Sequence, residues 1–343
     1  MKAGIVYNPR DIATEEIEMP TPGVGEVLLQ VKSAGICGSD LHYHRSKPDG
    51  NRVRRVMGGH ELSGIITGVG EGVISRKIGE RVGVEPLLGC GDCQFCRVGD
   101  YHLCSGLTHP GGGFKEYTVI TESKLFPLPD NVSYDDASIL DCFTVGVHAV
   151  QKAGTTITDT AAILGDGAIG LSTMEVVRAT GAKRVALIGH HQKNLDIAKK
   201  VGADIAINSA EEDEVDAIMK FTDGKGVDVV FETVGSTSST MEKAINMAKP
   251  GGKIVVIGIF TKPVGLELWR ALRYEIDIIF SYSYSTWNGQ PEFGIALDLL
   301  SRGKIDANSL ITHRFPIDKI SDAFHAALNK EESGALKVLI TYP

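Results

Sequence analysis

The sequence predicts an α/β protein in two parts, a mostly β domain and a doubly wound parallel sheet. Residues 1 to about 145 are dense in glycine and β-branched residues, and their short apolar runs are typical of irregular β structure. From about 155 to 283, strand-like and helix-like segments alternate, which favours a parallel sheet with helices on both faces. The tail from about 284 holds two helix-like segments and ends in a strand-like run.

The elements are expected in a definite order. The first part contains two long strand-like runs, at 26–36 and 62–73. In the second part, the predicted strands occupy 160–167, 183–189, 227–235, 252–260 and 276–283. The helix-like segments span 168–181, 194–203, 239–252, 291–305 and 320–330, and a final strand-like run spans 336–342. No internal repeat or low-complexity linker separates the parts.

The charge and the N-terminus bear on partners and location. A net charge of −8 counts against broad attraction to nucleic acid or an anionic membrane. The run MKAGIVYNPRD has no long apolar stretch, so we expect no signal or transit peptide. No apolar segment is long enough to cross a bilayer, so no membrane partner is predicted. We expect a cytoplasmic protein whose six cysteines are metal ligands or free thiols.

The segment ILGDGAIG places Gly165, Gly167 and Gly170 in the G-x-G-x-x-G spacing of a dinucleotide-binding loop. It lies between a strand-like run and a helix-like run, as the binding mechanism requires. Gly165 permits a tight turn, Gly167 lets the backbone approach a pyrophosphate, and Gly170 allows close helix–strand packing. The helix then begins with Ala168 and Ile169, whose end of the helix offers N–H groups to phosphates. A glycine-rich turn without a ligand is the alternative.

The next predicted strand ends without the acid that usually binds the ribose of NAD. No Asp or Glu occurs between Glu175 and Asp196, and Gly189 stands at the expected position. A carboxylate there would repel a 2′-phosphate by roughly 4 kcal/mol at a distance of about 4 Å and an effective dielectric of about 20. Its absence favours NADP(H) over NAD(H). The side chains that can contact the phosphate, or alternatively are solvated loop residues, are His190, His191 and Lys193.

Four of the six cysteines fall in the segment GCGDCQFCRVGDYHLC, spaced C-x2-C-x2-C-x7-C. They are Cys90, Cys93, Cys96 and Cys104. Turns between them let four thiolates converge on Zn²⁺, and four cysteines leave no open coordination position, so we predict a structural zinc site. A zinc ribbon for nucleic acid is the alternative, and the acidic charge balance counts against it.

A second set of metal-ligating residues is spread over GICGSDLHYH, GGHELSG and ILDCFTVGVHA. Together these segments offer one thiolate, one imidazole and one carboxylate, and three protein ligands with an open position are the pattern of catalytic zinc. Taken alone, each of these residue types is more often structural than a ligand.

Several motifs occur in one order along essentially the whole chain: CGSDLHY, GHE, the cysteine loop, GGFKEY, VGVHA, the glycine loop, FETVG and ITHRFP. In these motifs the sequence resembles the zinc-dependent medium-chain dehydrogenase/reductase family, in the style of its sorbitol and threonine dehydrogenase branch. The resemblance implies a GroES-like catalytic domain over 1–145, a Rossmann dinucleotide-binding domain over 146–283, and a return to the catalytic domain over 284–343. It also implies a homodimer or homotetramer, to which the strand at 276–283 would contribute by sheet extension.

By this resemblance Cys37 and His60 hold the catalytic zinc. Asp141 occupies the third-ligand position, where relatives usually have Glu or Cys. Because Asp is one methylene shorter than Glu, Glu61 or a water is the alternative third ligand of the zinc. Cys142 is an alternative only if the register slips by one residue.

The resemblance also implies a proton relay. The hydroxyl of Ser39 touches the substrate oxygen, and His42 is the outlet of the relay to solvent. Asp40 orients His60 through its other ring nitrogen. His148 belongs to the VGVHA pattern, and helix packing is the favoured interpretation for it.

Further residues are expected around the cofactor and substrate. Val234 and Gly258 are expected at the cofactor, and Lys337 is expected at the pyrophosphate or, alternatively, at a solvated strand edge. Ser281 stands near the position where sorbitol-type relatives tend to have an arginine, which counts against a sorbitol-like substrate. The predicted lining of the substrate pocket is Tyr43, Phe114 and Trp287.

The sequence therefore predicts an oxidoreductase with two zinc ions per chain. It would transfer a hydride between NADP(H) and a small-molecule substrate, which is a secondary alcohol, a polyol, or a sugar-derived alcohol or ketone. The metal would act as a Lewis acid on the substrate oxygen, and the nicotinamide would exchange the hydride. The alternatives are an NAD-linked polyol or threonine-type dehydrogenase of the same fold and, from another class, a non-catalytic nucleotide-binding protein.

Overall fold

The computed structural model describes residues 1–46, 53–236 and 239–343. The chain divides into two compact units. Unit 1 comprises Met1–Asp141 and Leu310–Pro343, and unit 2 comprises Cys142–Ser309. The first boundary falls in the first turn of helix α4 (Leu140–Ala153).

The second boundary differs from the one expected near residue 284. The hairpin β15–β16 (Thr286–Trp287, Gln290–Pro291) and helix α10 (Glu292–Ser301) belong to unit 2. Glu292 is fully buried there, and its Oε2 lies 2.9 Å from Nδ1 of His148 on α4. This buried pair ties α10 to unit 2, so the chain returns to unit 1 at Leu310.

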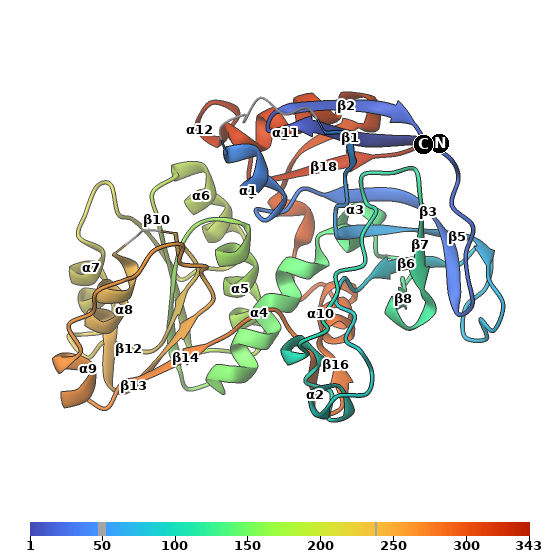
Figure 1. Cartoon of the computed structure of the whole chain (residues 1–343). Helices are drawn as coiled ribbons and strands as arrows, with labels where there is room; N and C mark the ends of the chain where they lie inside the picture. The colour runs from blue at the N-terminus through green and yellow to red at the C-terminus, as the bar shows by residue number, and fades with distance from the viewer. Residues whose placement is uncertain (47–52, 237–238) are drawn as a thin grey trace. The chain divides into compact units, whose positions relative to one another are not determined.

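In the described part of the chain, unit 1 holds a seven-stranded and a three-stranded sheet (Figure 1). The larger sheet has the order β17-β18-β3-β5-β6-β8, and β7 also pairs with β3. Its strands are β3 (Glu26–Gly35), β5 (Glu61–Val69), β6 (Arg81–Val84), β7 (Tyr117–Thr121), β8 (Leu125–Pro127), β17 (Ile311–Pro316) and β18 (Lys337–Thr341). The smaller sheet has the order β2-β1-β4, with β1 (Lys2–Asn8), β2 (Asp11–Glu16) and β4 (Arg55–Val56).

The helices of unit 1 are short. They are α1 (Asp40–Arg45), α2 (Gln94–Arg97), α3 (Tyr134–Ser138), α11 (Ile320–Leu328) and α12 (Lys330–Ser333). Alternation along β3 buries Val27, Leu29 and Val31 in the core, as expected for a strand with one face covered. The registers of the strands then set the position of the candidate metal ligands. Gly35 at the end of β3 pairs with Glu61 of β5 and with Leu339 of β18.

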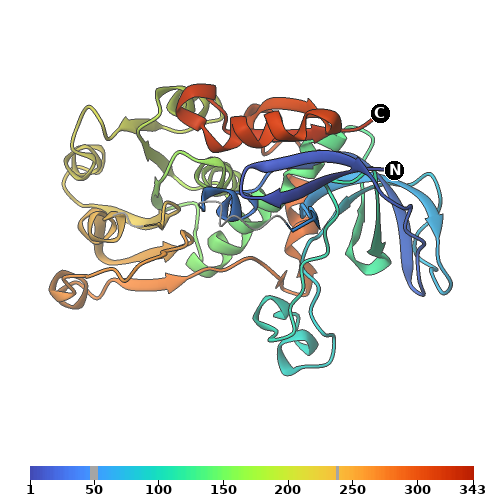
Figure 2. The same cartoon turned by 45° about the horizontal axis from the view of Figure 1, so that its top comes forward.

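In unit 2, the described residues form a six-stranded parallel sheet with the order β11-β10-β9-β12-β13-β14. The strands are β9 (Thr160–Leu164), β10 (Arg184–Gly189), β11 (Ile205–Asn208), β12 (Val227–Glu232), β13 (Ala248–Val256) and β14 (Asp277–Phe280). The helices, which Figure 2 shows on both faces of the sheet, are α5 (Ala168–Ala179), α6 (Gln192–Lys200), α7 (Glu214–Phe221), α8 (Thr240–Met247) and α9 (Trp269–Arg273). The strand order reverses at β9, and in such sheets ligands bind beyond the carboxyl ends of the strands at the reversal.

This fold is the α/β architecture that the sequence predicts, with a mostly β part and a doubly wound sheet. Among the helices of the described residues, none combines the length and apolarity needed to span a membrane.

Candidate functional site

Cys37, His60 and Glu61 converge at the neighbouring ends of β3 and β5. Cys37 lies two residues beyond the end of β3, and His60 directly precedes the first residue of β5, Glu61. One ligand atom from each residue lies within 4.8 Å of the other two. A thiolate, an imidazole and a carboxylate are donors that hold zinc, so the residues present fit this metal.

The charges around His60 also suit a cation. Burial lowers the pKa of His60, but a hydrogen bond with Cys37 and the charges of Asp141, Cys37 and Glu61 outweigh this effect and raise the pKa to about 10. Anionic groups that stabilise an imidazolium would equally stabilise a divalent cation. In the described residues, the carboxylate that converges with Cys37 and His60 is that of Glu61. Asp141, the expected third ligand, is not in this group and acts on His60 through its charge.

Asp40 has a different principal partner from the one expected. Its Oδ1 lies 4.0 Å from Nδ1 of His60, which is too far for a hydrogen bond. Its Oδ2 instead accepts a hydrogen bond from the backbone N–H of Cys37 at 2.8 Å. Burial raises the pKa of Asp40, against the opposing effects of His60 and of this hydrogen bond. Asp40 therefore holds the loop that carries Cys37, and it acts on His60 through its charge.

Lys337 also differs from expectation. It lies on β18 with a side chain only 4% exposed, and its Nζ donates a hydrogen bond to Oε1 of Glu61 at 2.5 Å. This buried pair corrects the alternative of a solvated strand edge. One N–H of the ammonium is given to Glu61, and the expected contact with a pyrophosphate stays a prediction. No sequence signal predicted the pair, because it depends on the pairing of β18 with β3 across most of the chain.

The proposed relay residues lie on or beside α1. Ser39 is the N-cap residue, and the backbone N–H of His42 donates to its carbonyl at 3.2 Å. Both side chains are exposed, and residues three apart share one face of a helix. Tyr43 is 39% exposed, and the guanidinium carbon of Arg55 lies 5.7 Å from its ring centroid.

Phe114 is a core residue. It is 1% exposed, and its ring packs edge-on against Phe324 with centroids 5.4 Å apart. This buried position corrects the expectation that Phe114 lines a substrate pocket. The GGF motif does not indicate in which direction the phenylalanine side chain points. Trp287 lies in unit 2, on β15 of the short hairpin, and is half-buried.

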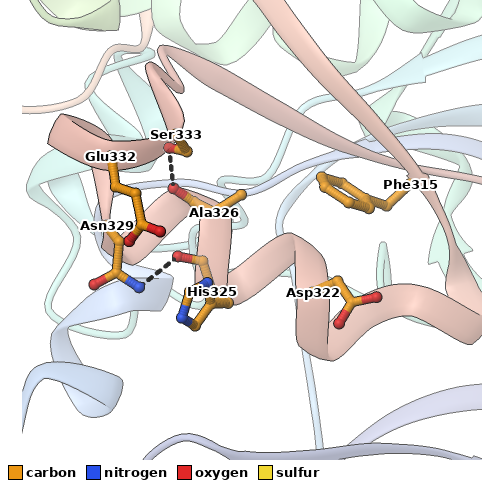
Figure 3. A pocket seen from close by; sticks show the side chains of 7 residues that line it. All are labelled: Phe315, Asp322, His325, Ala326, Asn329, Glu332 and Ser333. Carbon is orange, nitrogen blue, oxygen red and sulfur yellow. Dashed lines mark hydrogen bonds between the residues drawn. The ribbon is translucent and has the colours of Figure 1, made fainter.

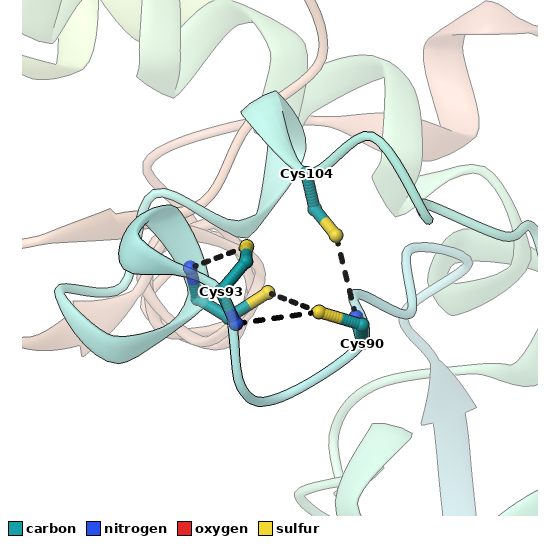
Figure 4. Close-up of side chains that lie close together, drawn as sticks. Cys90, Cys93 and Cys104 are labelled. Atoms are coloured by element: carbon teal, nitrogen blue, oxygen red, sulfur yellow. Dashed lines mark hydrogen bonds between the residues drawn. The ribbon is translucent and has the colours of Figure 1, made fainter.

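The four cysteines of the loop converge, with all Sγ atoms within 4.8 Å of one another. Figure 4 shows the sulfurs of Cys90 and Cys104 directed toward the same space, and the Sγ atoms of Cys90 and Cys96 lie 4.0 Å apart. Four sulfurs placed tetrahedrally at about 2.3 Å from zinc lie roughly 3.8 Å apart, so the group fits a four-thiolate site. The backbone N–H of Cys93 donates to Sγ of Cys90 at 3.4 Å and is the main reason that the pKa of Cys90 falls to about 7.

The glycine loop of unit 2 has the geometry that its sequence predicts. Gly165 has a φ of +118°, and a Cβ there would lie 2.4 Å from Oγ1 of Thr233. A Cβ at Gly170 would lie 1.9 Å from the carbonyl oxygen of Gly165. Gly167, by contrast, has open space beside it and is the N-cap of α5, which starts with Ala168 and Ile169. The backbone at Gly167 is therefore open to a phosphate, so the residues present fit a dinucleotide.

The end of β10 holds a carboxylate that sequence reasoning missed. Asp166, between the first two glycines of the loop, directs its side chain at the turn after β10. Its Oδ2 accepts hydrogen bonds from the backbone N–H groups of His190 at 3.0 Å and His191 at 2.7 Å. A Cβ at Gly189 would lie 2.3 Å from Cβ of Asp166. The only available signal was an acid inside the fingerprint itself, whose spacing does not indicate where it points.

The side chains of the turn after β10 are accessible. His190 and Lys193 are exposed, and the side chain of His191 is 41% exposed. The rings of the two histidines lie with their centroids 4.0 Å apart.

Val234 and Gly258 lie in the loops after β12 and β13. Glu232, which is fully buried, organises both loops: its Oε1 accepts from the N–H groups of Val234 and Gly235 at 3.0 and 2.9 Å. Its backbone carbonyl accepts from the N–H of Gly258 at 3.0 Å. Val234 is 43% exposed at this edge of the sheet, where a ligand can reach it.

A separate cavity of about 330 Å³ lies in unit 1 among α11, α12 and β17 (Figure 3). Two side chain-to-carbonyl hydrogen bonds, from Asn329 to His325 and from Ser333 to Ala326, hold its wall. None of the residues predicted to bind metal, cofactor or substrate lines this cavity.

Two family models match the chain. The alcohol dehydrogenase GroES-like domain matches residues 23–130, and the zinc-binding dehydrogenase model matches residues 168–302. The first covers the candidate catalytic centre and the cysteine loop, and the second covers the glycine loop.

Three known proteins are similar to this chain over its full length or nearly so. Sorbitol dehydrogenase of Bacillus subtilis is 34% identical over 100% of this chain and 97% of its own. The structure of RspB from Escherichia coli CFT073 complexed with NADH has a TM-score of 0.89 and 32% identity, covering 100% of this chain and 99% of that one. The structure of a zinc-binding dehydrogenase from Sinorhizobium meliloti 1021 bound to NADP has a TM-score of 0.87 and 29% identity, covering 99% of each. With this likeness along the entire sequence, the chain belongs to the zinc-dependent medium-chain dehydrogenase/reductase family.

Proposed function

We propose that this protein is a zinc-dependent oxidoreductase that transfers a hydride between NADP(H) and a secondary alcohol, polyol or sugar-derived alcohol or ketone. The observation that carries the proposal is the convergence of Cys37, His60 and Glu61 in a chain that also holds an intact glycine loop. The polyol class is supported by the similarity to a sorbitol dehydrogenase.

The residues of unit 1 supply the metal site and the proton path. Cys37 and His60 would hold the zinc, and Glu61 would lie beside it. The hydrogen bond from Lys337 fixes the position of the Glu61 carboxylate. When bound, the zinc would polarise the substrate oxygen as a Lewis acid and the nicotinamide would exchange the hydride. The hydroxyl of Ser39 would pass the substrate proton toward His42, and the exposure of both side chains on α1 supports this route to solvent.

NADP(H) preference rests on the turn after β10. That strand ends in Gly189, and the exposed side chains of His190 and Lys193 and the partly exposed one of His191 can meet a 2′-phosphate. One related structure contains NADP and another contains NADH, so both cofactors occur among relatives.

The test is to measure kcat/KM for NADP⁺ and NAD⁺ with a panel of polyols, hydroxy acids and short diols, and in reverse with ketoses. We expect NADP⁺ to give the higher kcat/KM with at least one secondary alcohol or polyol. Equal or better turnover with NAD⁺ would overturn the cofactor preference, and no turnover with any substrate would overturn the assignment as a dehydrogenase.

An NAD-linked dehydrogenase of the same fold is the second candidate, and Asp166 is the observation that favours it. This candidate would be favoured if the charge of the Asp166 carboxylate, which accepts the N–H groups of His190 and His191, opposed a 2′-phosphate. The same kinetic comparison distinguishes the two candidates.

The proposal includes two zinc ions per chain and a cytoplasmic location. The second zinc would occupy the site of Cys90, Cys93, Cys96 and Cys104, whose sulfurs converge. None of the six cysteines, all of which lie in the described residues, forms a disulfide, which suits a reducing compartment. Cell fractionation would test the location.

A homodimer or homotetramer is proposed from one exposed edge of unit 2. β14 is the last strand in its sheet, and Phe280 at its end is 73% exposed. Nearby along the chain, Trp269 and Leu272 on α9 are 67% and 71% exposed. Sedimentation analysis would test this proposal, and a monomer at micromolar concentration would contradict it.

A further inference from the structure

We propose that Asp166 is a positioning residue that holds His191 so that its Nε2 binds the 2′-phosphate of NADP. The inference rests on the proposed function, because it concerns the cofactor pocket of that enzyme. It assigns the third converging group found in the described residues, Asp166, His190 and His191, which neither zinc site uses.

Asp166 connects the glycine loop to the turn after β10 through several hydrogen bonds. Its Oδ2 accepts from the backbone N–H groups of His190 and His191. Both carboxylate oxygens lie 3.1 Å from Nδ1 of the His191 ring. The carbonyl of Asp166 accepts from Nδ2 of Asn194 at 2.9 Å. The Asp166 side chain is only 7% exposed, so these contacts are shielded from water.

Gly189 is required by this arrangement. A side chain at Gly189 would collide with Asp166, because its Cβ would lie 2.3 Å from Cβ and 2.4 Å from Cγ of the aspartate. An acid at the end of β10 and an acid at position 166 therefore exclude one another. The carboxylate is present in this pocket, but it comes from the loop and points at the turn.

The direction of the carboxylate decides its effect on a ligand. Its charge faces two backbone N–H groups and the Nδ1 of His191, and these donors offset it. With Nδ1–H given to Asp166, the ring nitrogen left for a ligand is Nε2, on a side chain that is 41% exposed. A carboxylate that accepts Nδ1–H fixes the orientation of the imidazole, and an Nε2–H of that ring can donate to a phosphate.

The test measures binding rather than turnover, by fluorescence titration of the full chain with NADPH and NADH. For Asp166→Asn we expect the Kd for NADPH to rise about tenfold and the Kd for NADH to rise much less. A tenfold rise is the usual effect of losing one hydrogen bond to a charged group. His191→Asn retains an N–H near the position of Nδ1 but lacks Nε2, and we expect the same selective loss. If Asp166 acts through His191, the double variant should be no more selective than His191→Asn alone.

Asp204→Asn is the matched control. Asp204 also accepts a backbone N–H of β10, that of Val185 at 2.7 Å, but at the opposite end of the strand. This variant should change both Kd values equally. If Asp166→Asn tightens NADPH, the carboxylate repels the phosphate and the inference is wrong. If it weakens both dinucleotides equally, Asp166 has only a structural role, which also overturns the inference. Failure of the unaltered protein to bind either dinucleotide would overturn the proposed function itself.

Discussion

Gly189 and the side chain of Asp166 compete for the same space at the end of β10. The sequence identifies Gly189 as the position where an NAD-binding acid is missing. The structure adds that Asp166 fills the space beside it. Substituting an acid at Gly189 therefore changes more than the charge of the cofactor site, because any side chain there must displace Asp166.

For Gly189→Ala we expect a loss of about 1–3 kcal/mol in the free energy of unfolding, the usual cost of forcing an extra methyl into packed structure. The physical reason is the 2.3 Å approach of the new Cβ to Cβ of Asp166. Urea denaturation would measure it. Gly167→Ala is the control, since nothing lies within 4 Å of its Cβ position, and its change should stay within about 0.5 kcal/mol. Equal stability of the two variants would contradict this account.

At the residue scale, local spacing predicts chemistry better than it predicts direction. The four cysteines of the loop were predictable, because short turns leave few ways to arrange them. The Glu61–Lys337 pair and the orientation of Asp166 were not, because each depends on which strands become neighbours. Phe114 was misplaced for the same reason.

At the scale of elements, α5 carries an unusual group. Glu175 is buried on this helix, and burial raises the pKa of Glu175 to about 8 despite a hydrogen bond from the backbone N–H of Asp306. The folded protein therefore keeps a proton that the unfolded chain releases near its ordinary pKa of 4.5. Because the folded state binds more protons across this range, stability must fall as the pH rises from about 4.5 to about 8.

Glu175→Gln keeps a carbonyl oxygen that can accept from Asp306 and removes the titration. We expect its stability relative to the unaltered protein to improve between pH 5 and pH 8, by an amount on the order of a few kcal/mol. Urea unfolding of both proteins at the two pH values measures this difference directly. A difference between the proteins that is the same at both pH values would show that Glu175 is ionised in the folded state.

Helices and strands were predicted well where the hydrophobic pattern extended over a long continuous segment of sequence. The strand expected at 183–189 is β10 (Arg184–Gly189), and the helix expected at 168–181 is α5 (Ala168–Ala179). The register of β3 against β5, which brings Cys37 to His60, could not be predicted, because it depends on long-range pairing and on two register shifts between these strands.

At the scale of the whole molecule, the sequence predicted two units and their fold classes. It placed the return to unit 1 too early, because the segment from 284 to 309 has no composition that marks it as part of the parallel-sheet unit. The contact of His148 with Glu292 ties α10 to that unit through two polar side chains buried together.

The proposed enzyme requires a catalytic zinc held by Cys37, and the cysteine loop would hold a second, structural zinc. The two sites are built from different residues, so one substitution should empty only one of them. Cys93→Ser serves as the matched control for Cys37→Ser, because it removes one thiolate from the other group.

The measurement that tests this claim most directly is the zinc content per chain of the purified protein and of Cys37→Ser, taken together with dehydrogenase turnover. We predict two zinc ions in the unaltered protein, and one zinc ion with no turnover in the variant. One zinc ion per chain in both proteins would contradict the account, because it would leave only the structural site.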